Sequence, residues 1–132
     1  MSHELGMKAV LSTSFDDAIE KTTLALKAEG FGVLTRIDVD NTFKEKLNAD
    51  FRRYVILGAC NPPLAHRALS ANADVGLLLP CNVTVQEENG QITVTAVDPE
   101  QMLSALRAEA EIAAVAAEAK TRLQRMVASL KD

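Results

Sequence analysis

Aromatic side chains are scarce in this chain, since they make up 4% of its 132 residues and tryptophan is absent. Its core must therefore be built from Leu, Val, Ile and Ala. Proteins that bind single-stranded nucleic acid stack bases on aromatic rings, so this composition disfavours that class. The formal net charge of −4 also disfavours broad contact with phosphate backbones or anionic membranes. We therefore expect neither nucleic acid nor a membrane as a partner.

Cysteine and histidine are also rare, with two of each. Two cysteines are too few for a disulfide framework. No apolar run approaches the ~18 residues of a membrane-spanning helix, and the first residues lack the layout of a signal peptide. We find no phosphate loop, no HExxH motif and no Ser-His-Asp order. The absence of a membrane-spanning run and of a signal peptide predicts a cytoplasmic protein, whose cysteines are reduced. Because none of these motifs is present, the sequence indicates no known type of catalytic site.

The overall composition is typical of a globular protein: 48% of the residues are hydrophobic and 24% are charged. A chain of this length fits one domain. The apolar pattern begins at Met7, after a short polar segment. We therefore expect residues 1–6 to be a disordered lead and residues 7–132 to form a single α+β domain.

Apolar spacing divides the chain into strands and helices. Strands are expected at Lys8–Ser12, Phe31–Val39, Arg52–Ala59, about Leu77–Glu87, and Gln91–Val97. Helices are expected from the Ser14 cap to Gly30, briefly after Asn41 and after Asn61, and from about Pro99 to Leu130 with a break near Arg107–Glu111. Asn89-Gly90 marks a hairpin turn between the last two strands. The order predicts an α+β fold, with one antiparallel or mixed sheet and helices on one face.

Two runs in the middle of the chain are distinctive together. They read "YVILGACNPPLAHRAL" and "GLLLPCNV". With the flanking pattern, from Met7 to about Leu130, the chain resembles domain-of-unknown-function family 302. The resemblance implies a β-α-β4-α fold, similar to the fold class of the TATA-box-binding protein, and a tendency to form homodimers. It implies no activity, because that family has no established biochemical role.

Each of these runs contains a cysteine followed by an asparagine. Cys60 lies between a strand and a helix, where the helix dipole can favour a reactive thiolate. Pro62 and Pro63 lack the N–H groups that would stabilise such an anion. Cys60 is therefore either a packing residue at a corner of the fold or a functional thiol, and the pattern leaves both interpretations open.

A metal site is a further hypothesis. If the strands that carry Cys60 and Cys81 are neighbours, their thiols could face each other and form a zinc-type site with His66. The spacing matches no known short metal motif. His66 follows Cys60 by six residues, which favours an exposed side chain rather than a ligand. The cofactor stays unknown, with a metal ion as the candidate.

Four other residues are candidates for lining a ligand site. Asn61 and Asn82 could bind a ligand, although capping and turn roles explain both. Arg53 could bind an anion, and Lys44 lies in the block "TFKEKL" that the resembling family shares. Both cations are also typical of a solvated surface.

Three functions follow from these patterns. The first is a non-enzymatic homodimer that binds a small molecule or metal near the two Cys-Asn pairs. The second is an enzyme of thiol or sulfur redox chemistry that uses Cys60 as nucleophile and Cys81 as resolving thiol. The third is a structural or partner-binding domain whose long C-terminal helix carries the interface.

Overall fold

The computed structural model describes residues 4–131. Five strands form one sheet in the order β1-β5-β4-β3-β2, and every neighbouring pair is antiparallel. The strands are β1 (Gly6–Leu11), β2 (Gly32–Asp38), β3 (Tyr54–Cys60), β4 (Cys81–Glu88) and β5 (Gln91–Val97). The helices are α1 (Phe15–Ala28), α2 (Val39–Leu47), α3 (Pro62–Ala71), α4 (Pro99–Met102) and α5 (Ala110–Leu130), with 3₁₀ turns η1 (Ala73–Leu78) and η2 (Ser104–Leu106). The predicted α+β class is confirmed.

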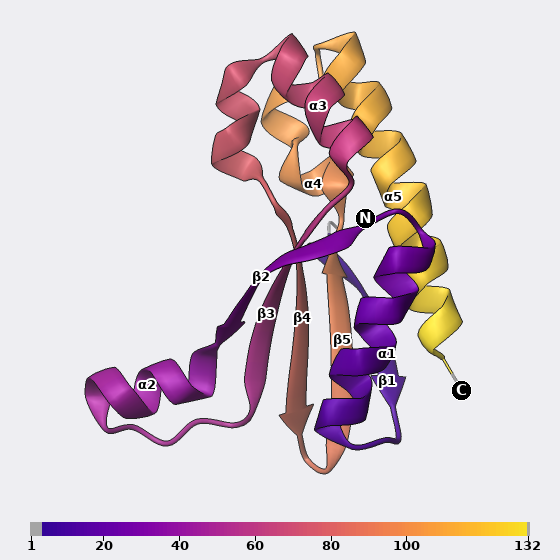
Figure 1. Ribbon diagram of the computed structural model, residues 1–132. Coiled ribbons are helices and arrows are strands. Elements are labelled where there is room, and N and C mark those ends of the chain that lie inside the picture. Colours follow the sequence, from indigo (N-terminus) through magenta and orange to yellow (C-terminus); the bar gives the residue numbers. More distant parts are fainter. Residues whose placement is uncertain (1–3, 132) are drawn as a thin grey trace.

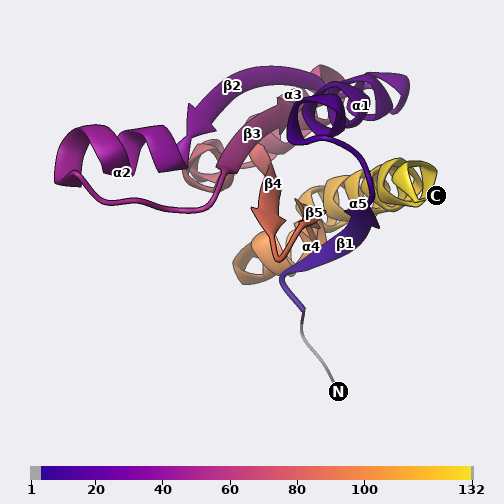
Figure 2. The same cartoon turned by 90° about the horizontal axis from the view of Figure 1, so that it is seen from below.

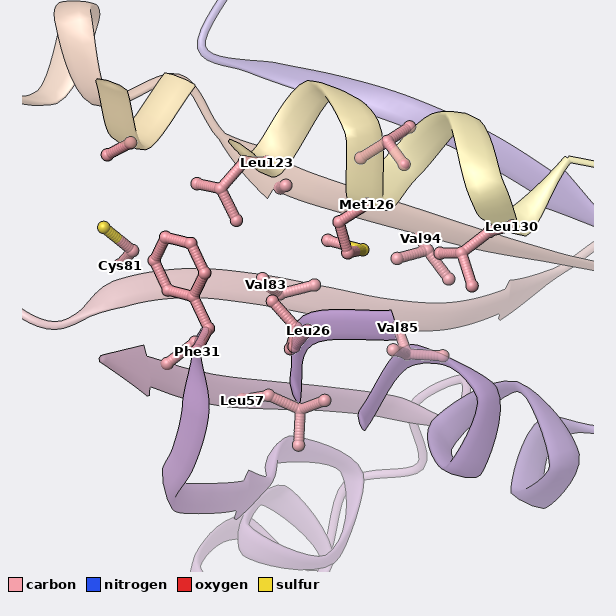
Figure 3. Packing of buried hydrophobic residues seen from close by; sticks show 14 of the residues in the cluster. Leu26, Phe31, Leu57, Cys81, Val83, Val85, Val94, Leu123, Met126 and Leu130 are labelled. Atoms are coloured by element: carbon pink, nitrogen blue, oxygen red, sulfur yellow. The ribbon is translucent and has the colours of Figure 1, made fainter. Parts of the chain in front are cut away.

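One face of the sheet carries the core, because successive strand residues point to opposite faces. Its buried side chains are Ala9, Leu11, Val55, Leu57, Ala59, Cys81, Val83, Val85, Ile92, Val94 and Ala96. Helices α1 and α5 lie side by side over this face (Figures 1 and 2). Leu123, Met126 and Leu130 of α5 point toward the valines of β4 and β5 (Figure 3). The core is therefore packed mainly from aliphatic side chains, whereas many protein cores rely on aromatic ones.

The remaining helices occupy two other places. Helices α3 and α4 and turn η1 gather beyond the end of the sheet where β3 stops and β4 begins (Figure 1). Helix α2 extends away from the body as an arm (Figure 2). None of the nine residues of α2 is buried, and the Asp40 carboxylate ties the arm to β3 by accepting from the Tyr54 N–H at 3.2 Å. Among residues 4–131, no helix is long and apolar enough to cross a membrane.

The sequence placed the start of β4 too early. Leu77 and Leu78, where the strand was expected to begin, belong to η1, and β4 begins at Cys81, directly after Pro80. The Asn72 side chain caps η1 by accepting from the Asp74 N–H at 2.9 Å, and proline cannot donate to a sheet ladder. At the other end of the chain, the expected break in the last helix is confirmed between α4 and α5.

Residues 4–6 of the expected disordered lead, residues 1–6, lie in the described part of the chain. Residues 1–3 lie outside the described part of the chain, but Gly6 is the first residue of β1 and pairs with Val97. The Leu5 carbonyl also accepts from the Asp98 N–H at 2.8 Å. The ordered sheet therefore starts one residue before Met7.

Thr22 on α1 generates a stability prediction. Its side chain is fully buried, and its hydroxyl is the one buried side-chain polar atom without a hydrogen-bond partner in the described part of the chain. A buried unsatisfied hydroxyl costs about 1–3 kcal/mol. The near-isosteric substitution Thr22→Val should therefore raise the free energy of unfolding by about 1 kcal/mol, measured by urea denaturation.

Thr23 on the same helix supplies the matched control. Its hydroxyl donates to the Ile19 carbonyl at 2.8 Å, so Thr23→Val removes a satisfied group and should give no gain. A Thr22→Val protein no more stable than Thr23→Val would contradict the prediction.

Candidate functional site

An apolar cavity of about 330 Å³ lies at the end of the sheet, among the helices gathered there. Its walls come from the end of β3, the start of β4, and helices α3, α4 and α5. Leu34 on β2 and Leu69 on α3 line it and are 68% and 42% exposed, so the lining of the cavity extends to the surface at these two leucines. The fold thus provides a pocket that is apolar at its mouth as well as inside.

Close packing at Gly58 shapes one side of the cavity. A Cβ atom at this position would overlap the Thr35 hydroxyl and come within 2.9 Å of Pro80 Cγ. Only glycine therefore lets β2, β3 and the residue before β4 approach so closely. Thr35 and Pro80 both line the cavity as a result.

The next residues of β3 lead into helix α3. Asn61 is the N-cap of α3, where its side-chain oxygen accepts from the Leu64 N–H at 3.1 Å, and Pro62 fills the first helical position. This capping role, which the sequence indicated, is confirmed. The cap turns the chain sharply, so that Cys60 and Leu64 line the same cavity.

Both cysteines line the cavity. In the pairing of β3 with β4, Ala59 lies opposite Cys81, and Cys60 is the next residue along β3. Cys81 is buried and lies beside the Phe31 ring at one end of the core, whereas Cys60 is half-buried (Figure 3). Both thiols are free. The neighbouring strands that the sequence hypothesis required are thus present.

The surroundings of the thiols keep them protonated near neutral pH. Burial raises the pKa of Cys60 above its ordinary value of 9.0. Burial, and secondarily the charge of Cys60, raise the pKa of Cys81 to about 11. A low thiol pKa needs a nearby cation, a metal or free helix N–H groups. No charged side chain is among the described residues that line the cavity, so neither cysteine resembles an activated nucleophile.

The two asparagines are separated. Asn61 is 8% exposed and lines the cavity. Asn82 lies opposite Gly58 in the sheet, is exposed, and is not among the lining residues. The alternation of strand side chains explains this, since Cys81 points to the core face and Asn82 to the other face.

The predicted cations and His66 also lie away from the cavity. His66 is exposed on α3. Lys44 is on the α2 arm, 3.2 Å from an Asp50 carboxylate oxygen. Arg53 precedes β3 at the far end of the sheet, with one guanidinium nitrogen 3.2 Å from an Asp16 oxygen and its centre 4.2 Å from the Phe15 ring centroid. These three side chains do not meet the two thiols.

The Cys60, Cys81 and His66 ligand set is therefore not assembled. In residues 4–131, no three His, Cys, Asp or Glu side chains come together as a metal site. The helical turn from Asn61 sends His66 to solvent while Cys60 stays at the cavity.

Several residues that line the cavity were not predicted from the sequence as site residues. They are Phe31, Leu34, Leu79, Met102, Val115 and Ala119. They come from separate stretches of chain, and their apolar spacing was explained by core packing alone. Met102, for example, lies within the helix that was expected from about Pro99 to Leu130. Only the tertiary arrangement distinguishes a cavity wall from a core.

The raised pKa of Cys81 predicts a pH dependence of stability. Folded Cys81 ionises near pH 11 and the unfolded thiol near 9.0, so the protonated thiol favours the folded state below pH 9. This contribution should be lost between pH 9 and 11, lowering the free energy of unfolding by roughly 2–3 kcal/mol. Urea denaturation of the reduced protein at pH 8, 9, 10 and 11 measures it.

The substitution Cys81→Ala isolates this contribution from other groups that titrate in the same range. We expect its stability to fall less steeply with pH than that of the wild type. Cys60→Ala, which removes the half-buried thiol, should retain most of the wild-type slope. Equal slopes for the wild type and Cys81→Ala would disprove the assignment.

Comparison with known proteins gives a consistent picture. The family model described as "Domain of unknown function DUF302" matches residues 7–130. The crystal structure of an uncharacterized conserved DUF302 protein from Bacillus stearothermophilus is similar, with a TM-score of 0.88 and 33% sequence identity over 96% of this chain and 98% of that one. No curated protein matches. The matched segment and the shared fold show that the chain belongs to the DUF302 family.

Proposed function

We propose that this protein binds a small, uncharged and largely apolar molecule in the cavity at the end of the sheet. The supporting observation is the cavity itself, with a volume of about 330 Å³ and an apolar mouth. This volume is at the lower end of the roughly 300–1000 Å³ typical of ligand pockets.

The polar groups of the cavity restrict the ligand. The described lining residues include no acid, no base and no histidine, so a buried charge on the ligand would have no partner. The Asn61 oxygen is already used as the α3 cap. Thr35 and the two cysteines are the other lining residues whose side chains contain a polar atom. These groups suit a neutral molecule with few hydrogen-bonding atoms.

The thiol chemistry favours binding over catalysis. An enzyme that uses Cys60 as a nucleophile needs a thiolate near neutral pH. Burial instead raises the pKa of both cysteines. The thiol-redox alternative therefore has less support than a binding role.

Filling the cavity tests the proposal. Ala65 lines the cavity on α3 and is half-buried, so Ala65→Phe can project a ring into the pocket without overfilling the core. We expect this substitution to weaken binding of the neutral fluorescent probe N-phenyl-1-naphthylamine by at least about tenfold, equivalent to about 1.4 kcal/mol. Fluorescence titration measures the affinity.

Ser70→Phe is the matched control, because Ser70 is exposed on the same helix and does not line the cavity. It should leave probe binding unchanged. If the wild type binds no probe, or if both variants bind equally well, the cavity is not the binding site.

We also propose that two copies associate through the α2 arm and the β2 edge. No residue of the α2 arm is buried, and its apolar Leu47 is 70% exposed. Phe51, which follows the arm, is 40% exposed. Strand β2 ends the sheet, and its Ile37 is 49% exposed. Such an edge and such apolar side chains are usually covered.

The charges of the arm suit a second copy of the same chain. Lys44 and Lys46 lie in its last turn and Asp40 in its first, so both signs are present along one short helix. In a two-fold dimer each surface meets its own copy, which requires both signs on one surface. A homodimer, as implied by the resemblance to the family, would satisfy this requirement.

Leu47→Glu should shift the protein from dimer to monomer, because it would bury two carboxylates without partners across the two-fold axis. Size-exclusion chromatography with light scattering gives the mass. The control is Leu77→Glu, on η1, since Leu77 is 85% exposed and lies outside the arm. A monomeric wild type, or a Leu47→Glu dimer, would refute this interface.

A further inference from the structure

The pairing of β2 with β3 contains an irregularity at Leu34. Val33 lies opposite Ala59. Thr35 lies opposite Gly58, which is the neighbouring residue of β3. Leu34 is therefore an extra residue without a partner in the ladder, and it forms a β-bulge in the edge strand of the sheet. Bulges occur at sheet edges and beside functional sites, where they redirect a side chain.

The bulge makes the strand change the face to which its side chains point. Val33 packs against the core, as does its partner Ala59. Thr35 points to the other face, where its hydroxyl lies against Gly58. In a regular strand residues 33 and 35 would share one face, because successive side chains alternate. Leu34 thus lies at the point where β2 changes face.

A leucine is not needed for the structural role of this bulge. Edge strands are protected by bulges, charged side chains or proline, and a bulge with a polar residue would protect β2 equally well. Leu34 is instead apolar, 68% exposed and part of the cavity lining. This combination indicates that a molecule in the cavity covers its side chain.

We propose that Leu34 is a specificity-determining residue of the cavity, and that it favours elongated, neutral, apolar molecules that continue from the interior to the surface end of the lining. The inner walls contribute little accessible surface, since Leu64, Leu103 and Val115 are all buried. A ligand that reaches Leu34 removes far more apolar protein surface from water there. Because the hydrophobic contribution grows with that area, such a ligand gains affinity over a shorter one.

This inference rests on the proposed function, since it needs a ligand in the cavity. It adds the length of the ligand and the residue that discriminates by length. Leu34 also lies on β2, the edge strand that we assign to the dimer contact. A role in that contact alone would affect the mass of the protein and not its preference among ligands.

The test compares two neutral fluorescent probes, 1-naphthylamine and the longer N-phenyl-1-naphthylamine, which carries one more ring. We expect the wild type to bind the longer probe more tightly. Leu34→Ala should weaken the longer probe by at least about fivefold, because it removes the apolar surface that the second ring covers. It should change the affinity for 1-naphthylamine by less than about twofold, since a ligand confined to the interior does not reach residue 34. Fluorescence titration measures both affinities.

Ile37→Ala is the matched control. Ile37 is an exposed residue of the same strand, but it pairs regularly with Ile56 and does not line the cavity. It should leave both affinities unchanged.

Deletion of Leu34 is a second variant that tests the bulge itself. It makes Val33 and Thr35 consecutive, like their partners Ala59 and Gly58, so the ladder becomes regular and the flanking side chains keep their faces. The deleted chain should therefore fold and show the same loss of preference for the longer probe.

Equal effects of Leu34→Ala on the two probes, including no effect on either, would overturn the role of Leu34 and leave the cavity as a binding site. A lower mass of Leu34→Ala by light scattering, with both affinities unchanged, would assign the residue to the dimer contact instead. If the wild type binds neither probe, or if Ala65→Phe weakens neither, the proposed function fails and the role of Leu34 fails with it.

Discussion

The antiparallel pairing of β3 with β4 is the interaction on which the rest of this structure depends. Its register places Val55, Leu57 and Ala59 on the same face as Val83 and Val85, and α1 and α5 bury that face. The same register brings the end of β3 next to the start of β4. The 20 residues from 61 to 80 connect these two strand ends, and α3, which lies among them, forms part of the cavity wall.

Much of the fold was readable from the sequence because local chemistry agrees with tertiary structure. The Ser14 cap, the Asn61 cap with Pro62 and the turn at Asn89-Gly90 each appear where expected. The start of β4 was missed because the apolar run before Pro80 fits a strand and a 3₁₀ turn equally well. The spacing of apolar residues in so short a run does not distinguish a strand from a 3₁₀ turn.

The candidate site was predictable only in part. The cysteines and Asn61 were found because their residue types are unusual at strand ends, and they do line one cavity. Asn82, His66, Lys44 and Arg53 lie elsewhere, since the direction of a side chain depends on register and helix phase. The apolar wall residues could not be recognised, because a Leu or Met facing a cavity has the same spacing as one facing a core.

The cavity draws its lining from residues as far apart as Phe31 and Ala119, so it exists only when β2, α3, α4 and α5 are all in place. A molecule that occupies it binds the folded chain and not the unfolded one. Occupancy therefore adds to the free energy of unfolding by an amount that grows with ligand concentration, about 2.7 kcal/mol at one hundred times the dissociation constant. A compound that binds in the cavity would therefore raise the melting temperature of the whole chain, and thermal denaturation in the presence of many compounds would identify it.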